Sequence, residues 1–221
     1  MAGASDPAWE DTPKDIDSQV AVMGIAPDTL LSGRYRLRRR LGHGGMAMVW
    51  LGFDERLERP VAIKVLSDTL ASDKTYLERF RREARVAASL QHPNLVPIYD
   101  FGSGDRPYLV MEYVEGGDLG VRLRGGDEPD PRVLAEQLLG ALRHIHAAGV
   151  IHRDIKPNNV LVDSYGEARL TDFGIAQPAD AISLTKTGEV IGTETYLAPE
   201  VLAGEPATVR SDLYALGVVL S

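Results

Sequence analysis

The chain has 221 residues, 44% hydrophobic and 25% charged, as in ordinary globular proteins. It contains no cysteine, which excludes a disulfide scaffold, a thiolate zinc site and a cysteine nucleophile. The net charge of −8 argues against sequence-independent binding to nucleic acid, because such binding depends on Lys and Arg neutralising phosphates. No secretory signal is visible, and the last apolar run, 215–220, is too short to span a bilayer. We expect a cytoplasmic chain without membrane contact of its own, and leave open that a longer parent is anchored through sequence beyond residue 221.

The first part of the chain predicts an unstructured leader followed by strands. Residues 1–32 are rich in Ala, Asp, Pro and Ser and carry six acidic residues against one Lys, so we expect a disordered acidic leader. Alternating or β-branched segments at 35–38, 49–52 and 61–66 predict strands, and the glycine-rich stretch 42–45 interrupts the first two.

Two segments predict amphipathic helices. The apolar residues of 73–90 recur at helical spacing, and Glu83 falls inside that apolar arc, where an unpaired carboxylate is costly. Glu83 therefore needs a cationic partner. Two further strands are expected at 95–99 and 108–113, before a second amphipathic helix over 131–147.

A glycine pair after the last of these strands marks the expected break between two lobes. We expect a small β-rich lobe over 33–114 and a mainly helical one over 115–221. The second helix carries His144 and His146, which we expect on its surface because no acid or cysteine lies at metal-binding spacing.

The most informative segment is the loop 152–159, His-Arg-Asp-Ile-Lys-Pro-Asn-Asn. It places a carboxylate (Asp154), an ammonium (Lys156) and an amide (Asn159) within a few positions of each other. A hydroxyl that attacks a phosphate needs a carboxylate to accept its proton, and an amide oxygen can bind a hard cation. Asp172, in the tripeptide Asp-Phe-Gly, offers a second carboxylate. The same tripeptide occurs at 100–102 without such a loop before it, and there we assign no role.

Together these motifs resemble the protein kinase signature set. The glycine loop 42–49, Val-Ala-Ile-Lys at 61–64, the helix residue Glu83, the loop 152–159, Asp-Phe-Gly and Ala-Pro-Glu at 198–200 occur in the order of that set. The resemblance covers about 34–221 and is to the bacterial, eukaryotic-like Ser/Thr protein kinases. It implies an α+β, two-lobed fold and transfer of the γ-phosphoryl of ATP to protein hydroxyls.

The resemblance also implies roles for individual positions. Asp154 is the expected catalytic base, Lys156 a γ-phosphate contact, and Lys64 the phosphate-binding lysine paired with Glu83. Asn159 and Asp172 are the expected Mg²⁺ (or Mn²⁺) ligands. The remaining expected ATP contacts are Leu41, Gly42, Gly44, Gly45, Val49, Ala62, Met111 as gatekeeper, Glu112 and Val114 through backbone groups, Asp118 at the ribose, and Leu161. The departure is Ala47, where the family usually has a third glycine.

Features of the later sequence suggest regulation by phosphorylation. Lys156 and Thr193 fit the Ser/Thr-specific pattern, and relatives of this type commonly phosphorylate a Thr-x-Thr pair such as Thr185 and Thr187. A phosphate there can dock on Arg153 and order the loop. Modification in trans would involve an N-lobe homodimer.

Two alternatives to an active kinase remain open. A pseudokinase or binding module is disfavoured because the lysine, the helix glutamate and the three cleft residues are all present. A small-molecule kinase would be expected to lack Ala-Pro-Glu. The chain also stops within an expected helix at Ser221, and the family pairs Glu200 with an arginine further on. For residues 1–221 alone we therefore expect a large lobe that is cut short and loosened, with little or no kinase activity.

Overall fold

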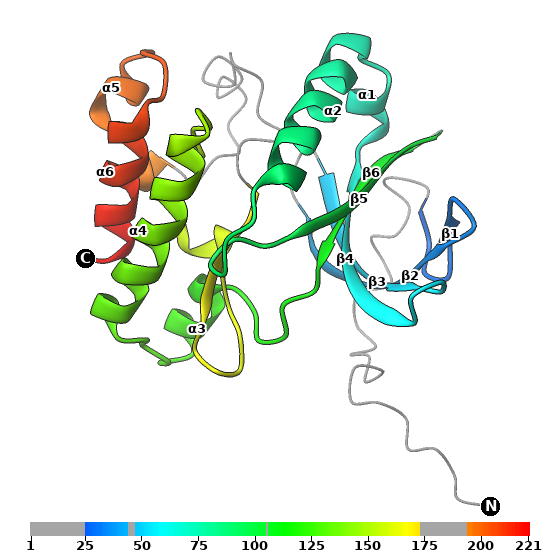
Figure 1. Ribbon diagram of the computed structural model, residues 1–221, viewed down its shortest axis with the longest axis horizontal. Coiled ribbons are helices and arrows are strands. Elements are labelled where there is room, and N and C mark those ends of the chain that lie inside the picture. Colours follow the sequence, from blue (N-terminus) through cyan, green and yellow to red (C-terminus); the bar gives the residue numbers. More distant parts are fainter. Residues whose placement is uncertain (1–24, 44–46, 105, 173–193) are drawn as a thin grey trace, which may run out of the picture.

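The computed structural model describes residues 25–43, 47–104, 106–172 and 194–221. The fold is α+β with two lobes, as expected from the sequence. Figure 1 shows the sheet together with α1 and α2 on one side and helices α3 to α6 on the other.

The first lobe is built on a six-stranded antiparallel sheet. Its spatial order is β1–β2–β3–β4–β6–β5. The strands are β1 (Leu30–Leu31), β2 (Tyr35–His43), β3 (Ala47–Asp54), β4 (Arg59–Leu66), β5 (Ile98–Ser103) and β6 (Pro107–Glu112). Apolar, often β-branched residues such as Val61, Ile63 and Val65 are buried along β4, which lies in the interior of the sheet.

The expected strand at 95–99 is largely displaced, since β5 begins only at Ile98. Residues before it bond to a different partner: the backbone N–H of Val96 donates to the Leu170 carbonyl at 3.0 Å, and Leu95 forms an isolated bridge with Leu170. Leu95 and Val96 therefore bond to a strand distant in the sequence, although local β propensity assigned them to the strand that begins at Ile98. The second Asp-Phe-Gly tripeptide lies within β5, where Asp100 accepts a hydrogen bond of 2.6 Å from the Tyr35 hydroxyl.

The predicted leader 1–32 is wrong over its last residues. Ile25 and Leu31 are buried, and β1 pairs with β2. Ile25 and Leu31 belong to the same apolar cluster as Tyr35 and Trp50. Residues 25–32 thus pack on the sheet, and residues 1–24 lie outside the described part.

Two helices follow β4. The short α1 (Asp68–Ala71) was not predicted, whereas α2 (Lys74–Ser89) matches the expected helix. The Asp73 side chain begins α2 by accepting hydrogen bonds from two backbone N–H groups of its first turn. Tyr76, Phe80, Ala84 and Ala87 are buried at intervals of three and four residues.

The second lobe is mainly helical. It contains α3 (Leu119–Arg124), α4 (Pro131–Ala147), the hairpin β7 (Val160–Val162) and β8 (Ala168–Leu170), α5 (Pro199–Leu202) and α6 (Val209–Val219). The helix α4 matches its expected bounds, and Gly149 just past its end has a positive φ of 75°, which terminates helices readily. None of the helices in the described part of the chain combines the length and apolarity that crossing a bilayer requires.

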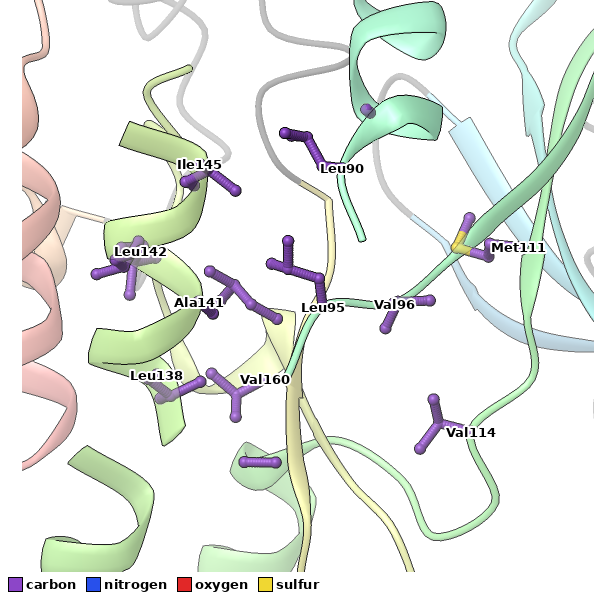
Figure 2. Close-up of a cluster of buried hydrophobic side chains, with 14 of the residues drawn as sticks. Leu90, Leu95, Val96, Met111, Val114, Leu138, Ala141, Leu142, Ile145 and Val160 are labelled. Atoms are coloured by element: carbon purple, nitrogen blue, oxygen red, sulfur yellow. The ribbon is translucent and has the colours of Figure 1, made fainter. Parts of the chain in front are cut away.

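One apolar core runs through both lobes. It includes α2, the segment 90–96, α4 and the β7–β8 hairpin. Figure 2 shows Leu95 of that segment between Leu90 and the α4 residues Ala141, Leu142 and Ile145. The segment before β5 therefore joins the lobes through packed side chains as well as through its bonds to β8.

Candidate active site

The loop 152–159 folds back on itself around Asp154. A 3-10 turn, Pro157–Asn159, returns the chain so that the Asn159 amide nitrogen donates to the Asp154 carbonyl at 2.7 Å and to its carboxylate at 2.8 Å. The Lys156 ammonium lies 2.9 Å from the same carboxylate oxygen. The structure thus brings together the three side chains that the motif predicted, with a carboxylate held by two donors.

Asn159 and Asp172 meet through the backbone. The N–H of Thr171 donates to the Asn159 carbonyl at 3.0 Å, which places the residue before Asp172 against Asn159. Because the Asn159 amide nitrogen faces Asp154, its amide oxygen points elsewhere, and no hydrogen bond to it occurs within the described residues. An amide oxygen and a carboxylate suit a hard divalent cation, so these two residues fit the expected metal site.

Lys64 is paired with Asp172, and the expected Lys64–Glu83 pair is not formed. The ammonium of Lys64, on β4, lies 2.7 Å from the Asp172 carboxylate. Burial alone would raise the pKa of Asp172, but the Lys64 charge and hydrogen bond lower it below its usual value. The sequence correctly indicated that burying the Glu83 carboxylate is costly. The expected ion pair between Glu83 and Lys64 is wrong for this structure.

Glu83 is partly buried on α2 and makes no ion pair within the described part of the chain. Burial raises the pKa of its carboxyl, and the charges of Arg153, Arg79 and Arg82 oppose this. Three guanidinium groups therefore lie near enough for their charges to act on this carboxylate, one of them from the catalytic loop. These charges offset only part of the cost of burial, because the pKa of Glu83 remains raised.

Asp212, near the start of α6, anchors the loop 152–159. Its carboxylate, which is 2% exposed, accepts hydrogen bonds from the backbone N–H groups of His152 at 2.8 Å and Arg153 at 2.9 Å. It also lies 2.8 Å from Nε2 of His146. The expected surface position of His146 is wrong, because its side chain is 10% exposed and faces this buried acid.

His152 joins the loop to the strand that leads to Asp172. Its Nδ1 accepts from the Asp154 N–H at 3.3 Å, so its Nε2 carries the proton that is donated to the Thr171 carbonyl at 3.0 Å. Burial lowers the pKa of His152, which favours this neutral form. Arg153 has a positive φ of 70°, a strained conformation for a non-glycine residue, and Asp212 bonds directly to its N–H.

The expected ATP-contact residues that the structure describes lie on strands of the first lobe, on the segment after β6 and on the β7–β8 hairpin. Val49 and Lys64 are cross-strand partners on β3 and β4, as are Ala62 and Met111 on β4 and β6. Met111 is buried and contacts the Thr171 hydroxyl through its sulfur at 3.8 Å. Leu41 and Gly42 lie on β2, Glu112 ends β6, Val114 follows it, and Leu161 lies on β7.

Asp118, which is expected at the ribose, has a local structural role in this structure. Its carboxylate begins α3 by accepting from the Val121 N–H at 2.9 Å, and it also accepts from Asn158 at 3.3 Å. Gly44, Gly45, Thr185 and Thr187 lie outside the described residues.

Sequence reasoning missed Asp212 and His146 as site residues. The sequence of α6 predicted only the start of a helix, and no local pattern shows that an acid in its first turn will face a histidine of another helix. Both assignments depend on how α4 and α6 pack, which the sequence pattern does not specify.

Comparisons with known proteins agree with this geometry. Residues 35–221 match the protein kinase domain family. The chain is 46% identical to the serine/threonine-protein kinase PrkC of Bacillus subtilis (strain 168) over 194 residues, which is 86% of this chain and 30% of that protein. It is 46% identical over 198 residues to PknA of Mycobacterium tuberculosis (strain ATCC 25618 / H37Rv), covering 86% of this chain and 46% of that protein. The chain thus spans less than half the length of these curated relatives.

A solved structure supports the same assignment. The crystal structure of the Mycobacterium tuberculosis PknI kinase domain is 33% identical, with a TM-score of 0.69, and the match covers 90% of this chain and 76% of that one. The family match extends over most of the chain and includes every motif that surrounds the cleft. The chain belongs to the protein kinase domain family.

Proposed function

We propose that this chain is the catalytic domain of an ATP-dependent Ser/Thr protein kinase. The observation that carries the proposal is the convergence of Lys156 and Asn159 on the Asp154 carboxylate, with Asp172 and Lys64 paired between the two lobes. This set supplies a base, positive charge for phosphate oxygens and two oxygen ligands for a cation. The similarity to proteins named serine/threonine-protein kinases supports the substrate class.

Each residue has a distinct task in the proposed reaction. The Asp154 carboxylate orients the incoming Ser or Thr hydroxyl and accepts its proton as the oxygen bonds to the γ-phosphorus and the bond to ADP breaks. Lys156 and Lys64 contribute positive charge beside the phosphates. Asn159 and Asp172 would hold Mg²⁺ or Mn²⁺, which supplies neutralisation of phosphate charge when bound.

Phosphotransfer to a generic protein substrate tests the proposal. The full-length protein should transfer phosphate from labelled ATP in the presence of Mg²⁺, with turnover within the roughly 1–100 s⁻¹ typical of kinases. Asp154→Ala and Lys64→Met should abolish transfer and retain the fold, whereas Asp127→Asn, which removes an exposed carboxylate, should be neutral. Nucleotide binding without transfer by the unaltered protein would instead support the pseudokinase alternative.

Activation by autophosphorylation is the second part of the proposal. Arg153 is exposed beside the catalytic base, and its charge acts on Glu83 together with those of Arg79 and Arg82, so a phosphate near this site would find compensating charge. We assign the phosphates to Thr185 and Thr187, added in trans within an N-lobe homodimer.

Mass spectrometry of the active enzyme and a concentration series test this second part. Both threonines should carry phosphate, and the rate of modification per molecule should rise with protein concentration. A Thr185→Ala, Thr187→Ala double variant with full activity would contradict the assignment, and a rate independent of concentration would contradict modification in trans.

A further inference from the structure

A chain of polar contacts runs along the segment that connects the two lobes. The carboxylate of Glu112, the last residue of β6, forms an ion pair with Arg169 of β8. The second terminal nitrogen of Arg169 lies 3.6 Å from the Asp163 carboxylate, just after β7. Arg169 is 24% exposed, Glu112 29% and Asp163 14%, so the group is partly withdrawn from solvent.

Two residues of the first lobe extend this chain. Tyr99 lies near the Glu112 carboxylate, and burial together with the Glu112 charge raises the pKa of Tyr99. The Arg59 guanidinium stacks over the Tyr99 ring, 3.8 Å from its centroid. Glu112 thus has a charged or polar neighbour from each lobe, Tyr99 on β5 near it and Arg169 on β8 paired with it.

The position of Arg169 relates this contact to the nucleotide cleft. Leu161 and Arg169 are direct cross-strand partners in the β7–β8 hairpin, so their side chains share one face. Leu161 is the expected floor of the adenine site. The Glu112 backbone, whose N–H donates to the Pro97 carbonyl at 3.0 Å, leads into the peptide expected to bond the adenine edge. The ion pair between Arg169 and Glu112 therefore connects the hairpin that carries the expected floor of the adenine site to the segment expected at its edge.

Two ion pairs join the lobes within the described residues, and they differ in kind. The Lys64–Asp172 pair consists of residues expected to contact phosphate and metal. The Arg169–Glu112 pair uses side chains for which the reaction has no need. Its guanidinium meets two carboxylates with two nitrogens, which a lysine ammonium cannot reproduce with the same geometry.

We propose that Arg169 is a positioning residue for ATP, which acts through the Glu112 side chain to hold the adenine-edge peptide at a fixed place over Leu161. The inference rests on the proposed function, since it concerns the nucleotide of that reaction. Loss of Arg169 weakens nucleotide binding without altering the groups around Asp154. The expected effect of Arg169→Met is a rise in KM for ATP of about 10-fold with kcat nearly unchanged, and Arg169→Lys restores part of the loss.

Steady-state kinetics of the full-length protein provide the first measurement. Tyr99→Phe, which removes only the hydroxyl near Glu112, should raise KM by a smaller factor and serves if Arg169→Met fails to fold. The matched control is Arg36→Met, because Arg36 pairs with Glu55 at 2.5 Å with similar exposure but entirely within the first lobe. An unchanged KM in Arg169→Met, or a fall in kcat with KM unchanged, overturns the inference.

Hydrogen exchange of the nucleotide-free protein provides a measurement that does not depend on activity. Amides of residues 113–118 should exchange faster in Arg169→Met than in the unaltered protein and in Arg36→Met. Equal exchange in all three proteins overturns the inference even if the protein is an active kinase. If the unaltered protein binds no ATP, the proposed function fails, and the exchange comparison alone then decides whether Arg169 holds this segment.

Discussion

Replacing Asp212 with asparagine should separate the positioning of the catalytic loop from nucleotide binding. One Asp212 oxygen accepts from the His152 N–H and lies against His146, and the other accepts from the Arg153 N–H. An asparagine can supply only one of these acceptors. With its oxygen toward His152 and His146, its amide nitrogen opposes the Arg153 N–H, so that bond is lost.

The size of the effect follows from this lost bond. A buried donor left without an acceptor costs about 1–3 kcal/mol. For a domain of 150–250 residues, each kcal/mol lowers the melting temperature by roughly 2–4 °C. Arg153, whose φ of 70° costs about 1–2 kcal/mol, also loses the contact that holds this conformation. The loop next to Asp154 is then free to relax, and a displacement of the order of 1 Å can reduce kcat by about 100-fold.

Kinetics and thermal melting of Asp212→Asn test the argument together. We expect kcat to fall by about 100-fold with KM for ATP nearly unchanged, because Asp212 holds neither the adenine-edge peptide nor Lys64. The control, Asp127→Asn, removes an exposed carboxylate 3.0 Å from Arg122 and should change stability by less than about 0.5 kcal/mol. A variant that melts lower but keeps its full kcat would show that the loop does not depend on Asp212 for its active conformation.

Three further changes give sharp outcomes. Glu83→Gln should raise the melting temperature above pH 4.5 but lower kcat. Burial raises the Glu83 pKa, so the carboxyl group favours folding below pH 4.5 and loses that benefit as pH rises. An equal gain in melting temperature at pH 4 and pH 8 would contradict this. Asp54→Asn should destabilise the protein strongly at pH 7 and less near pH 3. The Arg34 hydrogen bond lowers the Asp54 pKa, so the stabilisation from the ionised carboxylate disappears as pH falls below about 3.9. Urea titrations at pH 7 and pH 3 measure the difference. Gly116→Ala should lower the free energy of unfolding by about 1–3 kcal/mol more than Gly117→Ala, and should therefore unfold at a lower urea concentration. Both glycines have positive φ, but only at Gly116 would the added carbon meet a β7 carbonyl, at 2.2 Å. Equal urea midpoints would refute the clash.

Local patterns in the sequence predicted the elements whose pattern is strong. The apolar spacing of α2 and α4 set both helices within a residue, because an amphipathic stripe over four turns has few alternative structures. The motif loop around Asp154 was also predictable, since its contacts lie within five positions of each other. Structure that depends only on residues close together in the chain could therefore be predicted from the sequence.

The partners of charged groups were less predictable, because they depend on how separate elements are placed. Lys64 was expected to pair with Glu83, and its pairing with Asp172 instead depends on where α2 lies, which no short stretch of sequence specifies. The burial of His146 likewise follows from the packing of α6 on α4. Residues 25–32 were assigned to the leader by composition, which cannot detect that Ile25 and Leu31 join the apolar cluster on the sheet.

The two ion pairs between the lobes differ in how readily they can be exchanged. Lys64 pairs with Asp172 while Glu83 has no ion-pair partner among the described residues, so the cleft contains a second carboxylate that the family role assigns to the same ammonium. Exchange between two carboxylates costs only the difference between two similar interactions, which a change of a few kcal/mol can reverse. Glu112 is instead paired with Arg169, and no other cation forms an ion pair with it in the described structure. A rearrangement of the lobes should therefore exchange the contact at Lys64 while the link between Glu112 and Arg169 persists, which places the pivot of such a movement at the connecting segment.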